Sequence, residues 1–448
     1  MTRPHSLLPA ALLSLVWLGS LTLGPASASA ETPQEWLKKN LEGLVETYQQ
    51  FHRTPELSFQ EKETAAKLAE ELKKVGAEVT IGVGKTGVVG VLKNGKGPTV
   101  LVRTDLDALP VVEATGLPYA SRIMAEDVDG NPIGVMHACG HDIHITSQIA
   151  VARFLSEHKA DWQGTVVFIG QPAEEIGGGA EAMLKDGLFQ RFPRPDYGLA
   201  MHVDSSLPTG KIGYRAGYAL ANVDSVDITM RGRGGHGSAP HKTIDPIMQA
   251  AHLIVDLQTI ISRENSPLEP AVITVGAIHG GTKHNIIGDT CHLKLTVRSY
   301  SPAVRQGLLA AIKRKAQAAA ASAGAPEPSI EFSDATPALR NDERLVGRLV
   351  PVFAEAIGAD NLVAVPQSMG GEDFSQYGLA GVPIFMFRVG SVDPLRMAEA
   401  TSKGTPLPSL HSPRYFPDAP ETLRTGITTM CIAVMDLLPP KAKPDSGS

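Results

Sequence analysis

An excess of positive charge is the first thing this sequence lacks. Its 448 residues carry a formal net charge of −6, with no basic stripe and no charged tail. Proteins that bind nucleic acid usually present a basic face, so we expect no nucleic-acid partner. Charged residues make up 20% and hydrophobic residues 43% of the chain. These values are close to globular averages, which argues against a disordered chain and against a membrane-spanning bundle.

Cysteine is also scarce, and its count is odd. The three residues are Cys139, Cys291 and Cys431. In an oxidising compartment, cysteines are expected to pair as disulfides, so at least one of these thiols has another role or none.

An apolar run at the N-terminus indicates the compartment in which the protein is expected. Residues 10–23 are largely apolar, follow Arg3 and His5, and lead to a small-residue segment that ends at Ala30. This layout is typical of a secretory signal peptide over residues 1–30, with cleavage after Ala30. An uncleaved anchor is the alternative, but the run is short for a bilayer span and is interrupted by glycine. We therefore expect a periplasmic or secreted protein that has no membrane contact after cleavage.

The pattern of apolar residues indicates two kinds of domain. Helices are expected at residues 36–51 and 61–75, and strands at 79–81, 88–92, 99–102, 164–170 and 197–203. Such alternation is typical of an α/β fold with a largely parallel sheet. After about Gly217 the pattern changes to alternating strands at 223–232 and 293–299, with helices at 246–262 and 302–323.

The α/β pattern then returns towards the C-terminus. A helix is expected at 343–357, a strand at 383–389 and a last helix at 421–438. We therefore predict a discontinuous α/β domain, residues 31–217 and 331–448, into which a smaller α+β domain, residues 218–330, is inserted.

The segment MHACGHDIH, residues 136–144, holds the densest group of potential metal ligands. Five of its nine residues can bind a metal: His137, Cys139, His141, Asp142 and His144. Imidazole and thiolate together suit zinc and related divalent ions. A single histidine or cysteine is most often structural, but five in one segment predict a metal site. Spacing alone does not select which of them bind.

Acidic and imidazole groups also follow three predicted strands. Asp105 and Asp107 come after the strand at 99–102, Glu174 and Glu175 after the strand at 164–170, and His202 lies at the end of the strand at 197–203. Ligands of open α/β sheets bind at the carboxyl ends of the strands, so we expect these groups to share one rim.

The adjacent pair Glu174 and Glu175 suggests a division of roles. Two neighbouring glutamates are usually only a solvated pair, but these follow a buried strand and precede a glycine run. Side chains of neighbouring residues in an extended segment point to opposite sides. One carboxylate can therefore bind a metal while the other faces the substrate as a general base, as metal-assisted hydrolysis requires.

Six sequence blocks occur in a recognisable order, and together they identify a family resemblance. They are VRTDLDALPVVEATGLPYAS, MHACGHDIH, GQPAEE, GRGGHGSAP, SMGGEDFS and LHSPRYF. From about Trp36 to Leu438 the chain resembles the aminoacylase and glutamate-carboxypeptidase group of co-catalytic metallopeptidases. Within that group it is similar to the hippurate-hydrolase and indole-acetyl-amino-acid-hydrolase branch. The resemblance implies a mostly parallel-sheet catalytic domain with an inserted lid and dimerisation domain.

The resemblance also implies a two-metal site. Two divalent ions would be held by five residues: Cys139, His141, Glu175, His202 and His411. Zinc is favoured, with manganese, cobalt or nickel as alternatives. Other branches use a histidine and an aspartate where this chain has Asp105 and Cys139. The implied mechanism is attack by a hydroxide that bridges the metals, with Glu174 as general base, on the amide bond of N-acyl amino acids or small peptide-like substrates.

Further residues receive supporting roles from the same resemblance. Asp107 and Asp142 are assigned to orienting the ligands. In the lid, His236 would help to hold the oxyanion, often from the partner subunit of a homodimer. Asn285 and Arg298 would bind the substrate carboxylate, although an arginine at a strand end is often only a surface charge.

Two other functions fit the same sequence features. One is an exported dipeptidase or carboxypeptidase that uses the same site on a different acyl group. The other is a non-catalytic protein that binds a small ligand between two lobes. Glu174 argues against the second, because a binding protein has no need for a spare carboxylate beside a ligand carboxylate. Ile143, where related segments often have glycine, leaves the pocket shape and therefore the substrate open.

Overall fold

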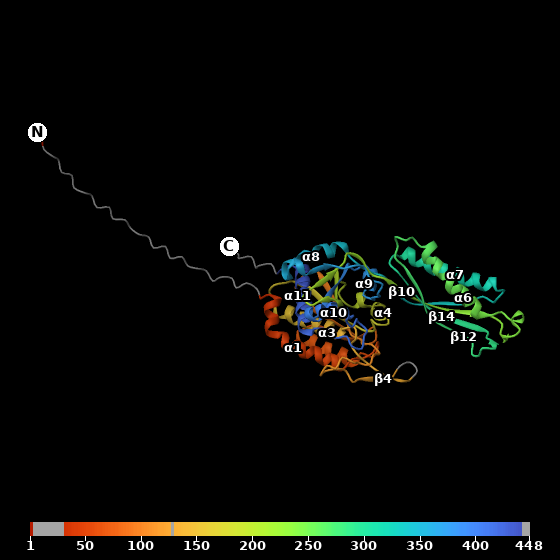
Figure 1. Ribbon diagram of the computed structural model, residues 1–448. Helices are drawn as coiled ribbons and strands as arrows, with labels where there is room; N and C mark the ends of the chain where they lie inside the picture. The colour runs from red at the N-terminus through yellow and green to blue at the C-terminus, as the bar shows by residue number, and fades with distance from the viewer. Residues whose placement is uncertain (3–30, 127–129, 441–448) are drawn as a thin grey trace.

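A computed structural model describes residues 31–126 and 130–440, together with Met1 and Thr2 (Figure 1). The predicted signal peptide therefore falls almost wholly outside the described residues. Within them, no helix is both long and apolar enough to cross a membrane. The chain forms a larger unit and a smaller unit that stands to one side of it (Figure 1).

An eight-stranded sheet forms the centre of the larger unit. In spatial order its strands are β1 (Glu78–Val83), β2 (Gly87–Asn94), β6 (Gly164–Gln171), β3 (Thr99–Asp105), β7 (Tyr197–Pro208), β18 (Ile384–Val392), β8 (Ile212–Tyr214) and β17 (Leu362–Ala364). The four central strands β6, β3, β7 and β18 are parallel, whereas β1, β2 and β8 pair antiparallel with their inner neighbours. The sheet is thus mostly parallel, which confirms the predicted fold class.

Helices cover both faces of this sheet. One face packs against α1 (Pro33–Arg53), α2 (Lys62–Lys74), α3 (His141–Glu157), α8 (Glu343–Ile357) and α11 (Ala419–Leu437). The other face packs against α4 (Gly179–Lys185), α5 (Leu188–Arg191) and α9 (Ser375–Leu379). In β3, Val100 and Val102 belong to the first core and Leu101 to the second. Central parallel strands are buried on both faces, which is why their sequences are continuously apolar.

The smaller unit is an antiparallel sheet covered on one face by two helices. The strand order is β12 (Val272–Gly280), β14 (Thr290–Ser299), β10 (Asn222–Arg231) and β15 (Ser329–Thr336). Helices α6 (Pro246–Thr259) and α7 (Pro302–Ser322) pack on it around a separate hydrophobic core. A short pair, β11 (Gly235–His236) and β13 (Ile286–Ile287), lies at its side.

The chain enters and leaves the smaller unit through two strands that pair with each other. These are β9 (Gly217–Leu220), just before β10, and β16 (Leu339–Asn341), just after β15. The domain boundaries at 218 and 330 stay a prediction; strand β15 of the smaller sheet continues to Thr336. The larger unit also contains the hairpin β4 (Met124–Glu126) and β5 (Pro132–Gly134), helix α10 (Pro394–Lys403) and the short 3₁₀ helix η3 (Ala359–Asn361).

Candidate metal centre

Most of the predicted site residues line or border one cavity at the carboxyl edge of the central sheet. Its volume is about 650 Å³. Strand β7 supplies His202, the loop after β6 supplies Glu174 and Glu175, and the loop before α11 supplies His411. Cys139 lies just before α3 and also lines the cavity. Segments far apart in the sequence therefore meet where an open α/β sheet places its ligands.

The N-terminus of α3 positions two histidines. Gly140 caps this helix with a φ of +76°, a conformation that glycine adopts without strain, and the turn places Cys139 before the helix and His141 at its first position. His144 lies one turn later on the same face. The motif therefore delivers its thiol and its first imidazole together to the end of the sheet.

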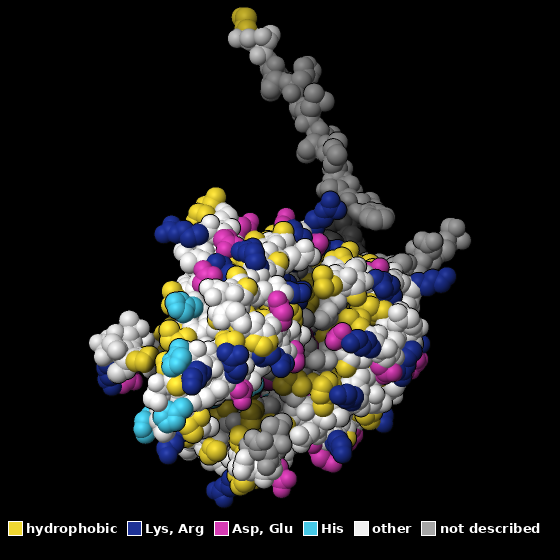
Figure 2. Space-filling model, turned by 90° about the vertical axis from the view of Figure 1, so that its right-hand side faces the viewer, with side chains coloured by type: hydrophobic (Ala, Val, Ile, Leu, Met, Phe, Trp, Pro, Cys, Tyr) yellow, Lys and Arg dark blue, Asp and Glu magenta, His cyan; other side chains and the backbone are white. Residues whose placement is uncertain are grey.

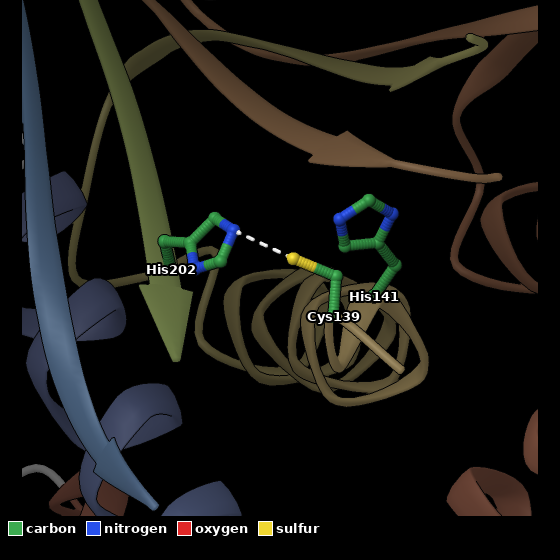
Figure 3. Close-up of side chains that lie close together, drawn as sticks. All are labelled: Cys139, His141 and His202. Atoms are coloured by element: carbon green, nitrogen blue, oxygen red, sulfur yellow. Dashed lines mark hydrogen bonds between the residues drawn. The ribbon is translucent and has the colours of Figure 1, made fainter. Parts of the chain in front are cut away.

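Hydrogen bonds fix which ring nitrogen of two histidines is free. His141 Nδ1–H donates to the backbone oxygen of Asp107 at 2.7 Å, and its Nε2 is buried without a hydrogen-bond partner. His202 Nδ1–H donates to the backbone oxygen of Val203 at 2.8 Å, and its Nε2 lies 3.6 Å from Cys139 Sγ. Figure 3 shows both rings beside the thiol. With Nδ1–H committed in each ring, Nε2 is the nitrogen that each imidazole has free to bind a metal.

Two of the closely spaced donor groups among the described residues share one sulfur. Cys139, His141 and His202 make the first group, and Cys139, Glu175 and His411 make the second; within each, the donor atoms lie within 4.8 Å of one another. Glu175 Oε1 is buried without a hydrogen-bond partner, and Glu175 Oε2 lies 3.5 Å from His411 Nε2. Orphaned buried acceptors are costly unless a cation satisfies them. The residues present therefore fit two divalent ions, which these donors would hold, with Cys139 common to both groups.

Glu174 belongs to neither of these two groups, although it forms a further set of closely spaced donors with His141 and Glu175. Its Oε2 is 3.9 Å from His141 Nε2, and its side chain is 10% exposed and lines the cavity. Burial, and then the nearby carboxylate of Glu372, raise the pKa of Glu174 well above its usual value. Burial likewise raises the pKa of Glu175, to about 7. A carboxylate with a raised pKa next to a metal-binding group is suited to taking up and returning a proton.

Asp107 connects two of the ligand-bearing segments. Its Oδ2 accepts hydrogen bonds from Ser58 Oγ at 2.7 Å and from the backbone N–H of Glu175 at 3.0 Å. Its backbone oxygen accepts from His141, as described above. Asp107 thus holds the His141 ring and the backbone of Glu175 in place, and its predicted role in orienting the ligands stays a prediction.

The Asp142 carboxylate points elsewhere. It bonds to His52 Nδ1 at 2.6 Å and to the backbone N–H of Ile143 at 2.9 Å, and to none of the five predicted ligands. His52 in turn lies 3.2 Å from Glu113. Asp142 therefore anchors the start of α3 to α1, a structural role that the motif alone did not distinguish.

Two other histidines of MHACGHDIH, His137 and His144, differ from His141 in their hydrogen bonding. His144 Nδ1–H donates to Asp105 at 2.7 Å, and its Nε2 accepts from the backbone N–H of Val203 at 2.9 Å, so neither nitrogen is available. His137 is buried and both its nitrogens lack hydrogen-bond partners in the described chain. Burial lowers the pKa of His137 to about 4, so this ring is neutral.

A buried network behind the site was not foreseen from the sequence. Arg103 donates to Asp105 at 2.7 Å, to Glu372 at 2.8 Å and to Asp373 at 3.3 Å. Burial alone would raise the pKa of Asp105, but the adjacent imidazoles and the Arg103 guanidinium hold it well below its usual value. The GGED part of SMGGEDFS was the available signal, and the pairing of its acids with Arg103 explains why these charges are tolerated without solvent.

The three residues predicted in the smaller unit fall in different places. Arg298 lines the cavity, where its Nη1 donates to the backbone oxygen of Met369 at 2.7 Å, and burial lowers its pKa. His236 and Asn285 are not among the residues that line the cavity. They lie together on β11 and the segment before β13, where Asn285 O accepts from the N–H of Gly237 at 2.9 Å.

His236 is exposed and has a defined tautomer. Its Nδ1 accepts a hydrogen bond from the backbone N–H of Ser238 at 3.1 Å, so the neutral ring carries its proton on Nε2. Several histidine side chains are visible on the surface seen from the side of the smaller unit (Figure 2). His236 can thus donate a hydrogen bond through Nε2–H, but it does not line the cavity of its own chain.

Comparison with known proteins places this geometry in a family. Residues 101–410 match the model of peptidase family M20/M25/M40. The chain is 37% identical to N-acetylcysteine deacetylase from Bacillus subtilis over 338 residues, which is 75% of this chain and 84% of the relative. It is 44% identical to hippurate hydrolase from Campylobacter jejuni over 261 residues, 57% of this chain and 64% of the relative.

A solved structure agrees with these sequence relatives. The fold is similar to that of Bacillus subtilis YxeP, a dinuclear metal-binding peptidase from the M20 family, with a TM-score of 0.72 and 31% identity. The alignment covers 90% of this chain and 99% of that protein. The chain therefore belongs to peptidase family M20/M25/M40 and, within it, to the metal-dependent amidohydrolases predicted from the sequence motifs.

Proposed function

We propose that the protein hydrolyses the amide bond of N-acyl amino acids or related small peptide-like substrates at a site for two divalent metal ions. One observation carries the proposal: two donor groups share Cys139, and the additional carboxylate of Glu174 lies beside them without belonging to either. The similarity to an N-acetylcysteine deacetylase and to a hippurate hydrolase supports the choice of N-acyl amino acids.

The proposed metal ligands are Cys139, His141, Glu175, His202 and His411. Their mixture of sulfur, nitrogen and oxygen donors favours zinc, with manganese, cobalt or nickel as alternatives. When bound, such ions lower the pKa of a water molecule and polarise the amide carbonyl. Glu174 would accept the proton of the attacking water and return it to the leaving amine, because its carboxylate has no other proposed role.

The smaller unit supplies groups that hold the substrate. Arg298 lines the cavity and donates to the substrate carboxylate. Asn285 lies beside His236, outside the cavity of its own chain, and would join Arg298 only from a partner subunit. His236 donates its Nε2–H to the oxyanion. Since His236 does not line the cavity of its own chain, we propose that it acts across a homodimer formed through the smaller unit. Closure of that unit over the cavity would exclude water and complete the site.

The decisive test replaces the proposed base. In Glu174→Gln the amide keeps the size of the side chain but cannot accept a proton, so turnover of N-acetyl and N-benzoyl amino acids should fall at least about 100-fold. Metal content, measured by inductively coupled plasma mass spectrometry, should stay at two ions per chain. Turnover that survives the substitution would refute the role of Glu174, and loss of metal would reassign it as a ligand.

We further propose that the protein is exported, on the basis of the signal-like residues 1–30. The helix α1 begins directly after them, with Thr32 as N-cap and a capping box completed by Glu35. A mature N-terminus at Glu31, read by mass spectrometry of protein purified from its source, would agree with cleavage after Ala30. An intact N-terminus would contradict it.

A further inference from the structure

A second arginine lines the same cavity as the candidate metal centre. Arg388 lies on β18, where its Cα is paired with that of His202 on the neighbouring strand β7. Arg298 reaches the cavity from the smaller unit, on β14. Two guanidinium groups therefore border the substrate space from different domains, whereas an N-acyl amino acid with a neutral side chain carries only one carboxylate.

Arg388 is largely buried but only partly paired. Its side chain is 21% exposed, and within the described residues its one ion-pair partner is Asp204, through a single contact of 3.3 Å from Nη1 to Oδ2. The other Asp204 oxygen already accepts from the backbone N–H of Ser206 at 2.8 Å and from its hydroxyl at 2.6 Å. Asp204 thus does not form the two-pronged pair that best satisfies a guanidinium.

The other acids of the cavity are committed elsewhere. Glu372 and Asp373 bond to Arg103, Glu175 belongs to the metal-binding group, and Glu174 is the proposed base. None of them lies within ion-pair distance of Arg388. A guanidinium has five N–H donors, so those that Asp204 leaves without an acceptor are open to a molecule bound in the cavity.

The backbone beside Arg388 leaves room for its side chain. Gly213 on β8 is the Cα partner of Arg388 on the side away from His202. A Cβ at Gly213 would come within 3.2 Å of the Arg388 Cβ and within 2.9 Å of Leu207 and Val365. A side chain at position 213 would therefore crowd β18 at Arg388.

We infer that Arg388 binds a second anionic group of the substrate, so that the preferred substrates are N-acyl amino acids with two carboxylates. This inference rests on the proposed function and refines it. The second carboxylate has two possible sources: an acidic amino-acid side chain, as in N-acetylglutamate, or the far end of a dicarboxylic acyl group, as in N-succinylmethionine. Both present the same chemistry to a guanidinium.

The test compares three substrates on the metal-loaded enzyme: N-acetylmethionine, N-acetylglutamate and N-succinylmethionine. We expect kcat/KM for one of the two diacids to exceed that for N-acetylmethionine. In Arg388→Gln the ratio of kcat/KM for the preferred diacid to kcat/KM for N-acetylmethionine should fall roughly 10- to 100-fold. This is the size expected for a lost hydrogen-bonded charge pair. The preferred diacid identifies which end of the substrate Arg388 faces.

Control variants separate recognition from stability. Arg348→Gln removes a half-exposed arginine that pairs with Asp436 on the helical side of the larger unit, and it should leave the substrate ratio unchanged. Arg388→Lys keeps the positive charge, so it should retain part of the preference if Arg388→Gln folds poorly. Metal content and melting temperature are measured for each variant.

A binding measurement distinguishes this inference from the proposed function. In metal-loaded Glu174→Gln, calorimetry should show tighter binding of glutarate than of butyrate, and the added Arg388→Gln change should abolish the difference. A substrate ratio that is the same in wild type and Arg388→Gln, with equal binding of the two acids, would overturn the inference while leaving amide hydrolysis in place. Absence of turnover on all three substrates, with the glutarate preference intact, would overturn the proposed function instead.

Discussion

Both proposed metal sites depend on one atom, the sulfur of Cys139. Because the two donor groups share it, Cys139→Ala should remove both ions, whereas His411→Ala, which affects one group only, should remove one. Metal-to-protein ratios of the purified variants check this directly. Cys431→Ala is the matched control, since that thiol is buried in α11 away from the site and its loss should leave two ions. Retention of both ions by Cys139→Ala would contradict the shared sulfur.

His52 provides a pH-dependent contribution to stability. Burial alone would lower its pKa, but hydrogen bonds to Asp142 and Glu113 outweigh burial and raise the pKa from 6.5 to about 9. A raised pKa means that the folded state binds the proton more tightly than the unfolded state does. The stabilisation is therefore complete below about pH 6.5 and is lost as pH rises through about 9.

The shift corresponds to roughly 3 kcal/mol of unfolding free energy between these limits. Denaturant unfolding at pH 6 and pH 9.5 should show this loss in wild type and a much smaller one in His52→Gln. Parallel pH profiles for the two proteins would show that the ion pair with Asp142 does not contribute in this way.

At the residue scale, the sequence indicated the type of chemistry better than it indicated the hydrogen-bond partners of each residue. The five proposed donors and Glu174 were assigned through the family resemblance that the motifs carry, because spacing alone did not select them. The motif did not show that His144 has both nitrogens bonded, or that Asp142 bonds to His52, because the partners Val203 and His52 lie 59 and 90 residues away. Long-range hydrogen bonds leave no local spacing to read.

At the scale of elements, the loop between β6 and α4 is held by close backbone contact. Gly179 is the first residue of α4, and a Cβ there would lie 1.5 Å from the backbone oxygen of Pro172. Gly179→Ala must therefore displace the loop that carries Glu174 and Glu175. We expect loss of metal binding and a destabilisation of at least about 2 kcal/mol, measured by metal content and by denaturant unfolding.

Gly347→Ala serves as the opposite control. It lies inside α8, is exposed, and has open space where a Cβ would be. There the substitution should stabilise by about 0.5 to 1 kcal/mol with unchanged metal content. If Gly179→Ala behaved like Gly347→Ala, the loop would not depend on this contact.

The elements that the sequence predicted are those with a strong local signal. The expected strands at 99–102, 164–170 and 197–203 lie within β3, β6 and β7, and the helix expected at 343–357 coincides with α8. The three-residue strands β8 and β17 were not predicted. Their strand character comes from pairing in the sheet, β8 with β18 and β17 with β8, and not from their own composition.

At the scale of the whole molecule, the position of His236 predicts an effect between subunits. Glu174→Gln and His236→Ala should each be inactive alone. If His236 acts on the cavity of its partner, mixed dimers of the two variants contain one complete site, and a mixed sample should recover about a quarter of the wild-type rate. Refolded or co-expressed mixtures, with dimer formation checked by analytical ultracentrifugation, provide the measurement. A monomeric protein, or a mixture with no recovered activity, would contradict action in trans.

The presence of a smaller unit inserted into a larger one was predictable from the sequence. The change from α/β to α+β pattern and back indicated an inserted unit, and the structure has a separate antiparallel sheet between β9 and β16. The strand order of the larger sheet was not predictable, because β6 pairs with β2 and β3, neither of which is its neighbour in sequence. Periodicity reports which face of a segment is buried, but not against which partner.

The backbone at His411 has a consequence for how this chain tolerates change. His411 has a φ of +67°, in the left-handed region that glycine prefers, and its side chain is 56% exposed. Holding a histidine there costs about 1 kcal/mol or more relative to glycine, and its exposed ring gains little from burial. Variants selected only for heat resistance should therefore drift towards glycine at this position and lose a donor without unfolding. Retention of histidine at position 411 would instead indicate continued selection for its role as a metal donor.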